Sequence, residues 1–176
     1  MPQNAIQNID VSKIYNGEVS EIPFSFELIP EDTENLDLAF KEPVKVTGRV
    51  YEKAHGKNRA ESYVELMFEI NGTFDTHCAR CACDITEDFH VERVYGITKK
   101  LMTDSDEFIE VPKGVLDVYE LAESVFYLEL PSKVLCSENC KGLCPVCGCD
   151  LNKKSCSCKK NIGANTLEEL KKLLDK

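Results

Sequence analysis

The chain has 176 residues, a formal net charge of −10 and 43% apolar residues. This length allows one domain of ordinary size plus an appendage, and the apolar fraction is enough to form a core. The negative charge argues against a general nucleic-acid binder, and no apolar run approaches the 18 residues or so that would indicate a membrane span.

Four segments in the first hundred residues alternate apolar and polar side chains. A period of two with one apolar face predicts half-buried antiparallel strands. The four segments are residues 22–28, 44–50, 64–70 and 89–97. A polar turn is expected at residues 55–59. Asn71-Gly72 is a turn signal, although a β-bulge fits the pattern equally well.

Cys78-Ala-Arg-Cys81 lies between the third and fourth expected strands. A redox C-x-x-C pair usually opens a helix, whose N-terminus lowers the pKa of the thiol. Here the following residues alternate as a strand, so we favour a pair of metal ligands over a redox pair. Cys83 lies just beyond the pair and is interpreted as a bystander thiol.

One well-marked helix is predicted near residues 117–129. Asp117 can act as its N-cap with Glu120 three residues later, and Pro131 ends it. We expect this helix to cover one face of the sheet. The acidic residues 103–110 before it predict a loop. A second capping pattern at Thr166 predicts a short C-terminal helix.

Seven of the ten cysteines lie between Cys136 and Cys158. Cys144-Pro-Val-Cys147-Gly has the form of a metal knuckle, a turn that brings two thiolates onto one ion. The N-terminal residues lack the pattern of a secretion signal, so we expect a cytoplasmic protein. In a reducing compartment, clustered cysteines favour metal ligation over disulfides.

Eight cysteines form four close pairs, and each zinc ion needs four ligands. We expect the pair at 78 and 81 to share an ion with the pair at 136 and 140, and the pairs at 144/147 and 156/158 to share another. The predicted ligands are Cys78, Cys81, Cys136, Cys140, Cys144, Cys147, Cys156 and Cys158. Cys83 and Cys149 would then be spare. One zinc ion with the other cysteines free is the main alternative, and iron in a four-thiolate site is less favoured.

The charge is unevenly distributed along the chain. Residues 1–135 carry a net charge of −13, whereas residues 136–176 carry +3. Lysines near the cysteines would offset the formal charge of −2 on a zinc ion held by four thiolates, and they would equally suit contacts to phosphate groups. The candidate phosphate contacts are Lys153, Lys154, Lys159 and Lys160.

Several motifs in fixed order resemble the YceD family, the large ribosomal RNA subunit accumulation proteins. They are Cys78-Ala-Arg-Cys81, Leu116-Asp-Val-Tyr-Glu-Leu, Leu128-Glu-Leu-Pro131, Leu135-Cys-Ser-Glu-Asn-Cys-Lys-Gly-Leu-Cys-Pro-Val-Cys147-Gly, and Leu151-Asn152 before Cys156-Ser-Cys158. The resemblance covers residues 22–158. It implies a bacterial cytosolic factor for accumulation of large-subunit ribosomal RNA, with no established enzymatic activity. We expect its partner to be that RNA or a large-subunit ribosomal protein.

We therefore expect an α+β fold with an antiparallel, barrel-like sheet, a covering helix and a Cys-rich, metal-bound C-terminal segment. The expected division is a β-rich domain at 1–131 and a zinc-binding segment at 132–176, packed on the first. The expected function is a non-enzymatic role in ribosome assembly with structural zinc sites, no membrane association and no small-molecule substrate. The alternative is a thiol redox or metal-dependent enzyme that uses the cysteine clusters.

Overall fold

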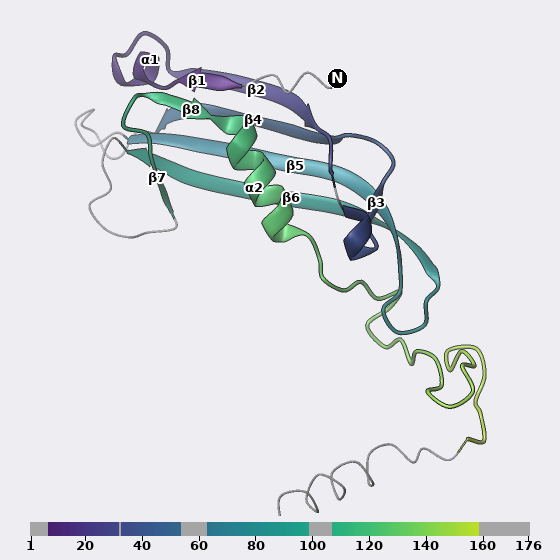
Figure 1. Ribbon diagram of the computed structural model, residues 1–176. Coiled ribbons are helices and arrows are strands. Elements are labelled where there is room, and N and C mark those ends of the chain that lie inside the picture. Colours follow the sequence, from purple (N-terminus) through teal and green to yellow (C-terminus); the bar gives the residue numbers. More distant parts are fainter. Residues whose placement is uncertain (1–6, 32, 54–62, 99–106, 159–176) are drawn as a thin grey trace, which may run out of the picture. The chain divides into compact units, whose positions relative to one another are not determined.

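The computed structural model describes residues 7–31, 33–53, 63–98 and 107–158 (Figure 1). Its elements in chain order are β1 (Asn8–Asp10), α1 (Ser12–Tyr15), β2 (Glu21–Leu28), η1 (Thr33–Leu36), β3 (Ala39–Phe40), β4 (Val44–Lys53), β5 (Tyr63–His77), β6 (Asp84–Thr98), β7 (Phe108–Glu110), β8 (Val115–Asp117) and α2 (Val118–Glu129). The predicted turn at 55–59 and the predicted C-terminal helix lie outside the described residues.

The main sheet runs in the order β2-β4-β5-β6-β7, and β3 pairs with β5. Its four long strands confirm the four segments predicted from alternation. The antiparallel register places Ile22 opposite Val50 and Phe26 opposite Val46, so apolar side chains of neighbouring strands share one face. The strand β5 continues through Asn71-Gly72, which rules out a turn there, one of the two alternatives that the sequence left open.

The sheet is open, which corrects the expectation of a barrel-like sheet. Among the described residues, the path of neighbouring strands begins at β2 and ends at β7, and these two strands do not pair. The α+β class itself is confirmed. The apolar face of the sheet is covered by a helix, so the strands need not curve around to cover their own core.

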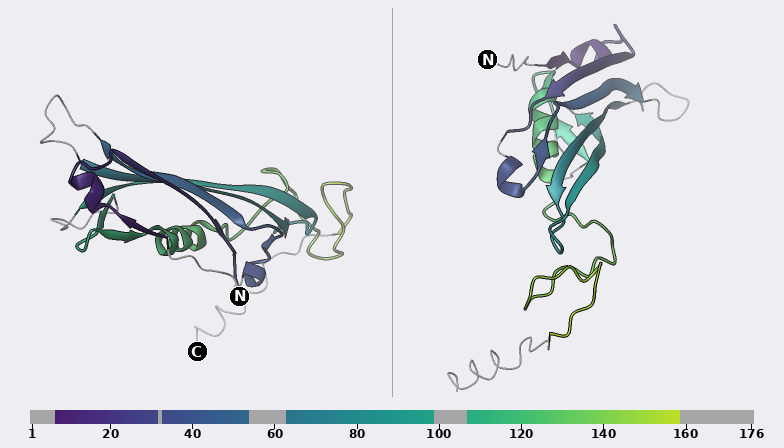
Figure 2. Two further views of the ribbon diagram at one scale, coloured as in Figure 1. Left: turned by 90° about the horizontal axis from the view of Figure 1, so that it is seen from above. Right: turned by 90° about the vertical axis from the view of Figure 1, so that its right-hand side faces the viewer.

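The helix α2 begins and ends where the sequence predicts. The side chain of Asp117 accepts hydrogen bonds from the backbone N–H groups of Tyr119 and Glu120, as an N-cap does. The helix lies across one face of the sheet (Figures 1 and 2). The ring of Phe126 is fully buried and packs 5.2 Å from Phe89, centroid to centroid. Complete burial of such a side chain stabilises the fold by roughly 1.5–3 kcal/mol.

Two features of this region were absent from the sequence-based expectations. The strand β1 pairs antiparallel with β8, with Ile9 opposite Leu116. Part of the predicted acidic loop forms β7, which pairs parallel with β6 through residues 108–110. The strands β1, β7 and β8 have three residues each, which is too short to display a period of two.

By their internal contacts, the residues divide into two units. The first comprises residues 1–76 and 85–132, and the second comprises residues 77–84 and 133–176. The second unit therefore includes the connection between β5 and β6, where the first cysteine pair lies. No helix among the described residues has the length and apolar character needed to cross a membrane.

Candidate metal centres

The first cysteine pair lies in a tight turn at residues 78–83. The N–H of Cys78 donates to the carbonyl of Cys83 and the N–H of Ala82 donates to the carbonyl of Cys78, each at 2.8 Å. The backbone N–H of Arg80 lies 3.5 Å from the sulfur of Cys78 and donates to it. Ala82 has a positive φ of 54°. A turn of this kind directs N–H groups towards sulfur, which favours thiolate ligands.

Residues 144–149 form the same turn. The N–H of Cys144 donates to the carbonyl of Cys149, and the N–H of Gly148 donates to the carbonyl of Cys144, each at 2.8 Å. Gly148, which corresponds to Ala82, has a φ of 70°. The two turns thus share the pattern Cys-x-x-Cys-x-Cys, with the same pair of backbone hydrogen bonds. We call them knuckle 1 (residues 78–83) and knuckle 2 (residues 144–149).

Five thiols gather around knuckle 1. The sulfurs of Cys78, Cys81, Cys83 and Cys136 all lie within 4.8 Å of one another. The sulfur of Cys140 lies 3.7 Å from that of Cys78, and the sulfur of Cys136 lies 3.6 Å from that of Cys81. With Zn–S bonds of about 2.3 Å, two sulfurs on a tetrahedral ion are about 3.8 Å apart. These two separations therefore fit a tetrahedral zinc ion.

Cys140 is held in place by residues from both chain segments of the second unit. Its side chain is 3% exposed, and its sulfur accepts a hydrogen bond of 3.4 Å from the Nδ2 of Asn152. Its carbonyl accepts a hydrogen bond of 2.9 Å from Nη1 of Arg80. Asn152 also accepts a bond from the N–H of Lys141 at 2.7 Å. Hydrogen bonds to a ligating sulfur are typical of the surroundings of a metal site.

A second group of thiols forms around knuckle 2. The sulfurs of Cys144, Cys147, Cys149 and Cys156 lie within 4.8 Å of one another. Cys158 belongs to the same neighbourhood, because hydrogen bonding with Cys147 is the main reason that its pKa rises to about 12. All ten cysteines of the chain are therefore distributed between two groups of five.

Backbone N–H groups favour the thiolate form of the first cysteine of each knuckle. The N–H of Cys136, followed by those of knuckle 1, lowers the pKa of Cys78 to about 5 against the opposing effect of burial. The N–H groups of Cys147 and Val146 lower the pKa of Cys144 to about 6. Both first positions are thus prepared to act as thiolate ligands.

The neighbouring thiols show the opposite effect. Burial is the main reason that the pKa of Cys149 is raised to about 12, and the adjacent thiols of Cys147 and Cys156 raise it further. The thiol of Cys140 is the main reason that the pKa of Cys136 is raised to about 11. Packed thiolates repel one another, and a divalent cation among them relieves that repulsion. An all-sulfur donor set of this kind fits a structural zinc ion.

A lysine-lined cavity of about 660 Å³ adjoins the second group. It is lined by Lys141, Lys153 and Lys154 together with Asn152 and Cys156. Lys153 also forms an ion pair of 3.5 Å with Asp150. The cavity brings together two of the four lysines predicted to contact phosphate; the other two, Lys159 and Lys160, lie outside the described residues.

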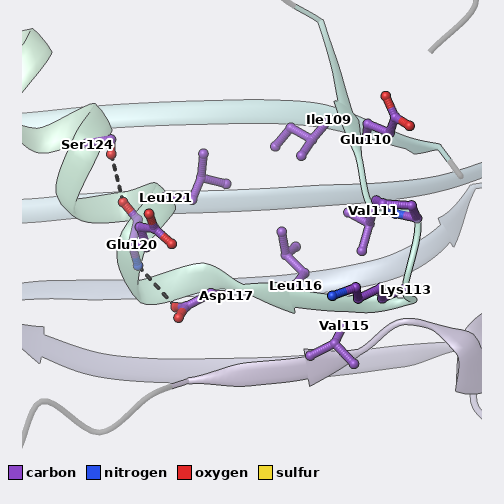
Figure 3. A pocket seen from close by; sticks show the side chains of 11 residues that line it. Ile109, Glu110, Val111, Lys113, Val115, Leu116, Asp117, Glu120, Leu121 and Ser124 are labelled. Carbon is purple, nitrogen blue, oxygen red and sulfur yellow. Dashed lines mark hydrogen bonds between the residues drawn. The ribbon is translucent and has the colours of Figure 1, made fainter. Parts of the chain in front are cut away.

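A separate groove of about 450 Å³ lies on the first unit, where the chain passes from β7 through β8 into α2 (Figure 3). Its lining includes the apolar side chains of Val111, Leu116 and Leu121. Glu110, Asp117 and Glu120 add negative charge to the lining, and Lys113 adds one positive charge. The hydroxyl of Ser124 donates to the carbonyl of Glu120 at 2.9 Å, within the first turns of α2. An apolar lining with acidic side chains suits a basic protein segment.

The structure assigns places to two cysteines that the sequence analysis treated as spare. Cys83 joins the first group of thiols and Cys149 joins the second. The signal that could have identified them is the repeated Cys-x-x-Cys-x-Cys pattern, which places a third cysteine at the same position in each knuckle. The eight predicted ligands are divided between the two groups as expected, and ligation by each of them remains a prediction.

Of the comparisons with known proteins, one found a match. A family model described as "Large ribosomal RNA subunit accumulation protein YceD" matches residues 66–174, which is more than half of the chain. The match includes most of β5, all of β6, the helix α2 and every cysteine. No curated protein and no solved structure matched the chain.

Proposed function

The chain belongs to the YceD family of large ribosomal RNA subunit accumulation proteins, and from this membership we propose that it is a non-enzymatic factor in assembly of the large ribosomal subunit. Family membership is the observation that carries the proposal. In this proposal the protein acts in the cytoplasm by binding, and the two groups of thiols hold structural zinc ions. The partner is large-subunit ribosomal RNA.

The chemistry of the thiol groups supports a structural role for the metal. Four thiolates saturate a tetrahedral zinc ion, so no position remains for water or substrate. A catalytic zinc site keeps such a position and commonly has histidine or carboxylate ligands. Each group offers five thiols, and the first group brings together thiols from segments far apart in sequence, such as those of Cys78 and Cys140. A zinc ion would therefore hold these segments together.

The distribution of charge supports a contact with RNA through the second unit. Residues 1–135 carry a net charge of −13 and would be repelled by bare RNA. The exposed side chains of Lys141, Lys153 and Lys154 surround one cavity beside the second thiol group. Lysines grouped in this way suit contacts to a phosphodiester backbone, together with Lys159 and Lys160, which follow in sequence.

The experiment measures binding of the native, metal-loaded protein to large-subunit RNA fragments across a salt series. The variant replaces Lys153, Lys154, Lys159 and Lys160 with alanine. If all four contact phosphates, the slope of log affinity against log salt should fall by about three for single-stranded RNA. Metal content measured on the same samples should remain at the parental value, because none of the four residues is a ligand.

A matched control removes the same charge from the first unit, at Lys13, Lys41, Lys45 and Lys113. This control should bind RNA with the parental salt dependence. Equal binding by the parent and the first variant would exclude the lysine-lined contact. Binding only to basic ribosomal proteins, abolished by charge reversal at Glu110 and Glu120, would place the partner at the groove of the first unit instead. Turnover of a ribosomal substrate would overturn the non-enzymatic role.

A further inference from the structure

Each group of thiols contains one sulfur more than a tetrahedral ion binds. The first group has five thiols where zinc takes four, and so has the second. The fifth thiol in each group must therefore lie beside a metal ligand without being one. Its identity decides what chemistry the centre can undergo.

The geometry points to the third cysteine of each knuckle as the surplus thiol. In knuckle 1, the separations of 3.7 Å between Cys78 and Cys140 and 3.6 Å between Cys81 and Cys136 match the edge of a zinc tetrahedron. The sulfur of Cys83 approaches that of Cys81 more closely, at 3.4 Å. Cys83 is partly exposed and Cys136 is exposed, so both can be reached from solvent, whereas Cys140 is buried. Of these thiols, Cys83 is the one that lies 3.4 Å from Cys81 and two residues from it in the chain.

Knuckle 2 repeats this arrangement. Cys149 occupies the position of Cys83, because its carbonyl accepts the equivalent hydrogen bond from Cys144, and it too is partly exposed. Its sulfur lies within 4.8 Å of that of Cys147, two residues earlier. Residues two positions apart are separated by at most about 7 Å between Cα atoms, so a disulfide between them needs little movement of the chain.

We propose that Cys83 and Cys149 are oxidation sites, which peroxide converts to disulfides with the adjacent ligands Cys81 and Cys147, and that this oxidation releases the metal. The proposal goes beyond the binding role above and rests only on its structural-zinc part. It makes the fold of the second unit dependent on the redox state of two thiol pairs, because metal binding supplies the folding energy of such segments.

The reaction balances with hydrogen peroxide as the oxidant. The Cys83 thiolate attacks one peroxide oxygen, so an S–O bond forms, the O–O bond breaks, and hydroxide leaves and is protonated to water. The Cys81 sulfur then attacks the sulfenic sulfur, so the S–S bond forms and a second hydroxide leaves as water. Two sulfurs lose two electrons and the peroxide gains them. Cys81 is then part of a disulfide and is no longer a thiolate ligand.

Tryptic peptides separate the cysteines of the first group, which allows a direct test of the pair Cys81 and Cys83. Cleavage after Arg80 and Arg93 gives a peptide of residues 81–93 whose only cysteines are Cys81 and Cys83. Residues 134–141 form another peptide, which contains Cys136 and Cys140. After dilute peroxide treatment of the native zinc-loaded protein, peptide 81–93 should lose two hydrogens while peptide 134–141 stays reduced. Zinc release, followed with a chromogenic chelator, should occur at the same rate as this loss of hydrogens. Dithiothreitol should reduce the disulfide and so restore the two hydrogens.

The variants test the assignment of the surplus thiols. Cys83→Ser with Cys149→Ser should retain the parental zinc content but release zinc roughly tenfold more slowly under peroxide. The matched control Cys140→Ser with Cys158→Ser should lose zinc before any oxidation. Loss of zinc from the first variant without peroxide would overturn the proposal, because Cys83 and Cys149 would then be ligands. So would oxidation of peptide 134–141 with peptide 81–93 intact.

The design distinguishes a failure of this proposal from misfolding of the variants and from the absence of metal in the parent protein. If the serine variants fail to fold, peptide mapping of the parent protein still decides which thiols are oxidised. If the untreated parent contains no metal, the structural-zinc part of the proposed function fails, while the disulfide between Cys81 and Cys83 remains testable by mass. Neither measurement involves RNA, so a failure of RNA binding leaves this proposal unaffected.

Discussion

The burial of Glu65 differs from what the alternation of apolar and polar residues along its strand predicts. Alternation along β5 places it on the polar side of the strand, yet it is only 5% exposed. Its carboxylate accepts hydrogen bonds from Tyr51 at 2.6 Å, Lys53 at 2.8 Å and Tyr63 at 2.9 Å. Buried carboxylates persist only when they are paired in this way. The charge is therefore compensated by side chains of two neighbouring strands.

This setting predicts a dependence of stability on pH. Burial raises the pKa of Glu65, but the hydrogen bonds from Lys53, Tyr51 and Tyr63 outweigh it and hold the pKa below its ordinary value. A lowered folded-state pKa means that the stabilisation is present above the unfolded-state pKa of about 4.3 and is lost as pH falls through the folded-state value. Glu65→Gln should lower the free energy of unfolding by about 1–3 kcal/mol at pH 7.

Denaturant unfolding of Glu65→Gln and the parent from pH 7 down to pH 3 checks this prediction. The difference in free energy of unfolding between the parent and Glu65→Gln should become smaller in acid, because protonation of Glu65 removes the stabilisation from the parent. Glu27→Gln, which removes an exposed carboxylate from β2, is the matched control and should leave the free energy of unfolding close to the parental value at pH 7. A difference that stays constant across the pH range would contradict the linkage.

At the scale of the element, the two knuckles show that one turn can be built from different residues. The position with positive φ is Ala82 in knuckle 1 and Gly148 in knuckle 2. For a residue with a Cβ atom, this left-handed conformation costs roughly 1–2 kcal/mol, which glycine avoids. Knuckle 1 therefore contains backbone strain that knuckle 2 lacks.

Replacing Ala82 with Gly should stabilise the first centre. Glycine loses about 0.5–1 kcal/mol more chain entropy on folding, so the net gain is about 0–1.5 kcal/mol. Chelator titration of the zinc-loaded protein should show metal retained to a higher chelator concentration. Gly148→Ala is the reverse control: no atom lies within 4 Å of the added Cβ, so only backbone strain should weaken the second centre. Easier loss of metal from the Ala82→Gly variant would show that the turn is not strained.

At the scale of the whole molecule, the two units are stabilised by different means. The first has a continuous apolar core that includes Val46, Leu66, Phe68 and Phe126, each at most 2% exposed. Among described residues 133–158, the only buried side chains are those of Cys140 and Cys144. Such a segment buries too little apolar surface to order itself, so metal binding must supply its folding energy.

Removal of metal should therefore unfold the second unit before the first. Hydrogen exchange with and without a zinc chelator should show protection lost first in residues 77–84 and 133–158, while residues 44–53 and 63–76 keep theirs. Adding zinc back should restore the lost protection. A uniform loss across both units at one chelator concentration would mean that they unfold as a single cooperative body.

Local patterns were enough to predict much of this molecule. The long strands follow from alternation along segments such as 64–70, and helix α2 begins at Asp117 because its side chain caps the first N–H groups. Knuckle 2 can be predicted from the motif Cys144-Pro-Val-Cys147-Gly alone. These features depend on residues within about one turn or one strand of each other, so a short stretch of sequence contains their physical cause.

Other features depend on segments that are distant along the chain. The pairing of β1 with β8 joins residues more than a hundred positions apart, and its strands are too short to reveal a period. The open form of the sheet follows from coverage by α2, since Phe126 fills the space over Phe89. Cys83 and Cys149 were interpreted as spare because the other eight cysteines form four close pairs, enough for two zinc ions with four ligands each. The turn of each knuckle, closed by a backbone hydrogen bond to the carbonyl of Cys83 or Cys149, places that cysteine beside the other thiols, so that each centre has five sulfurs.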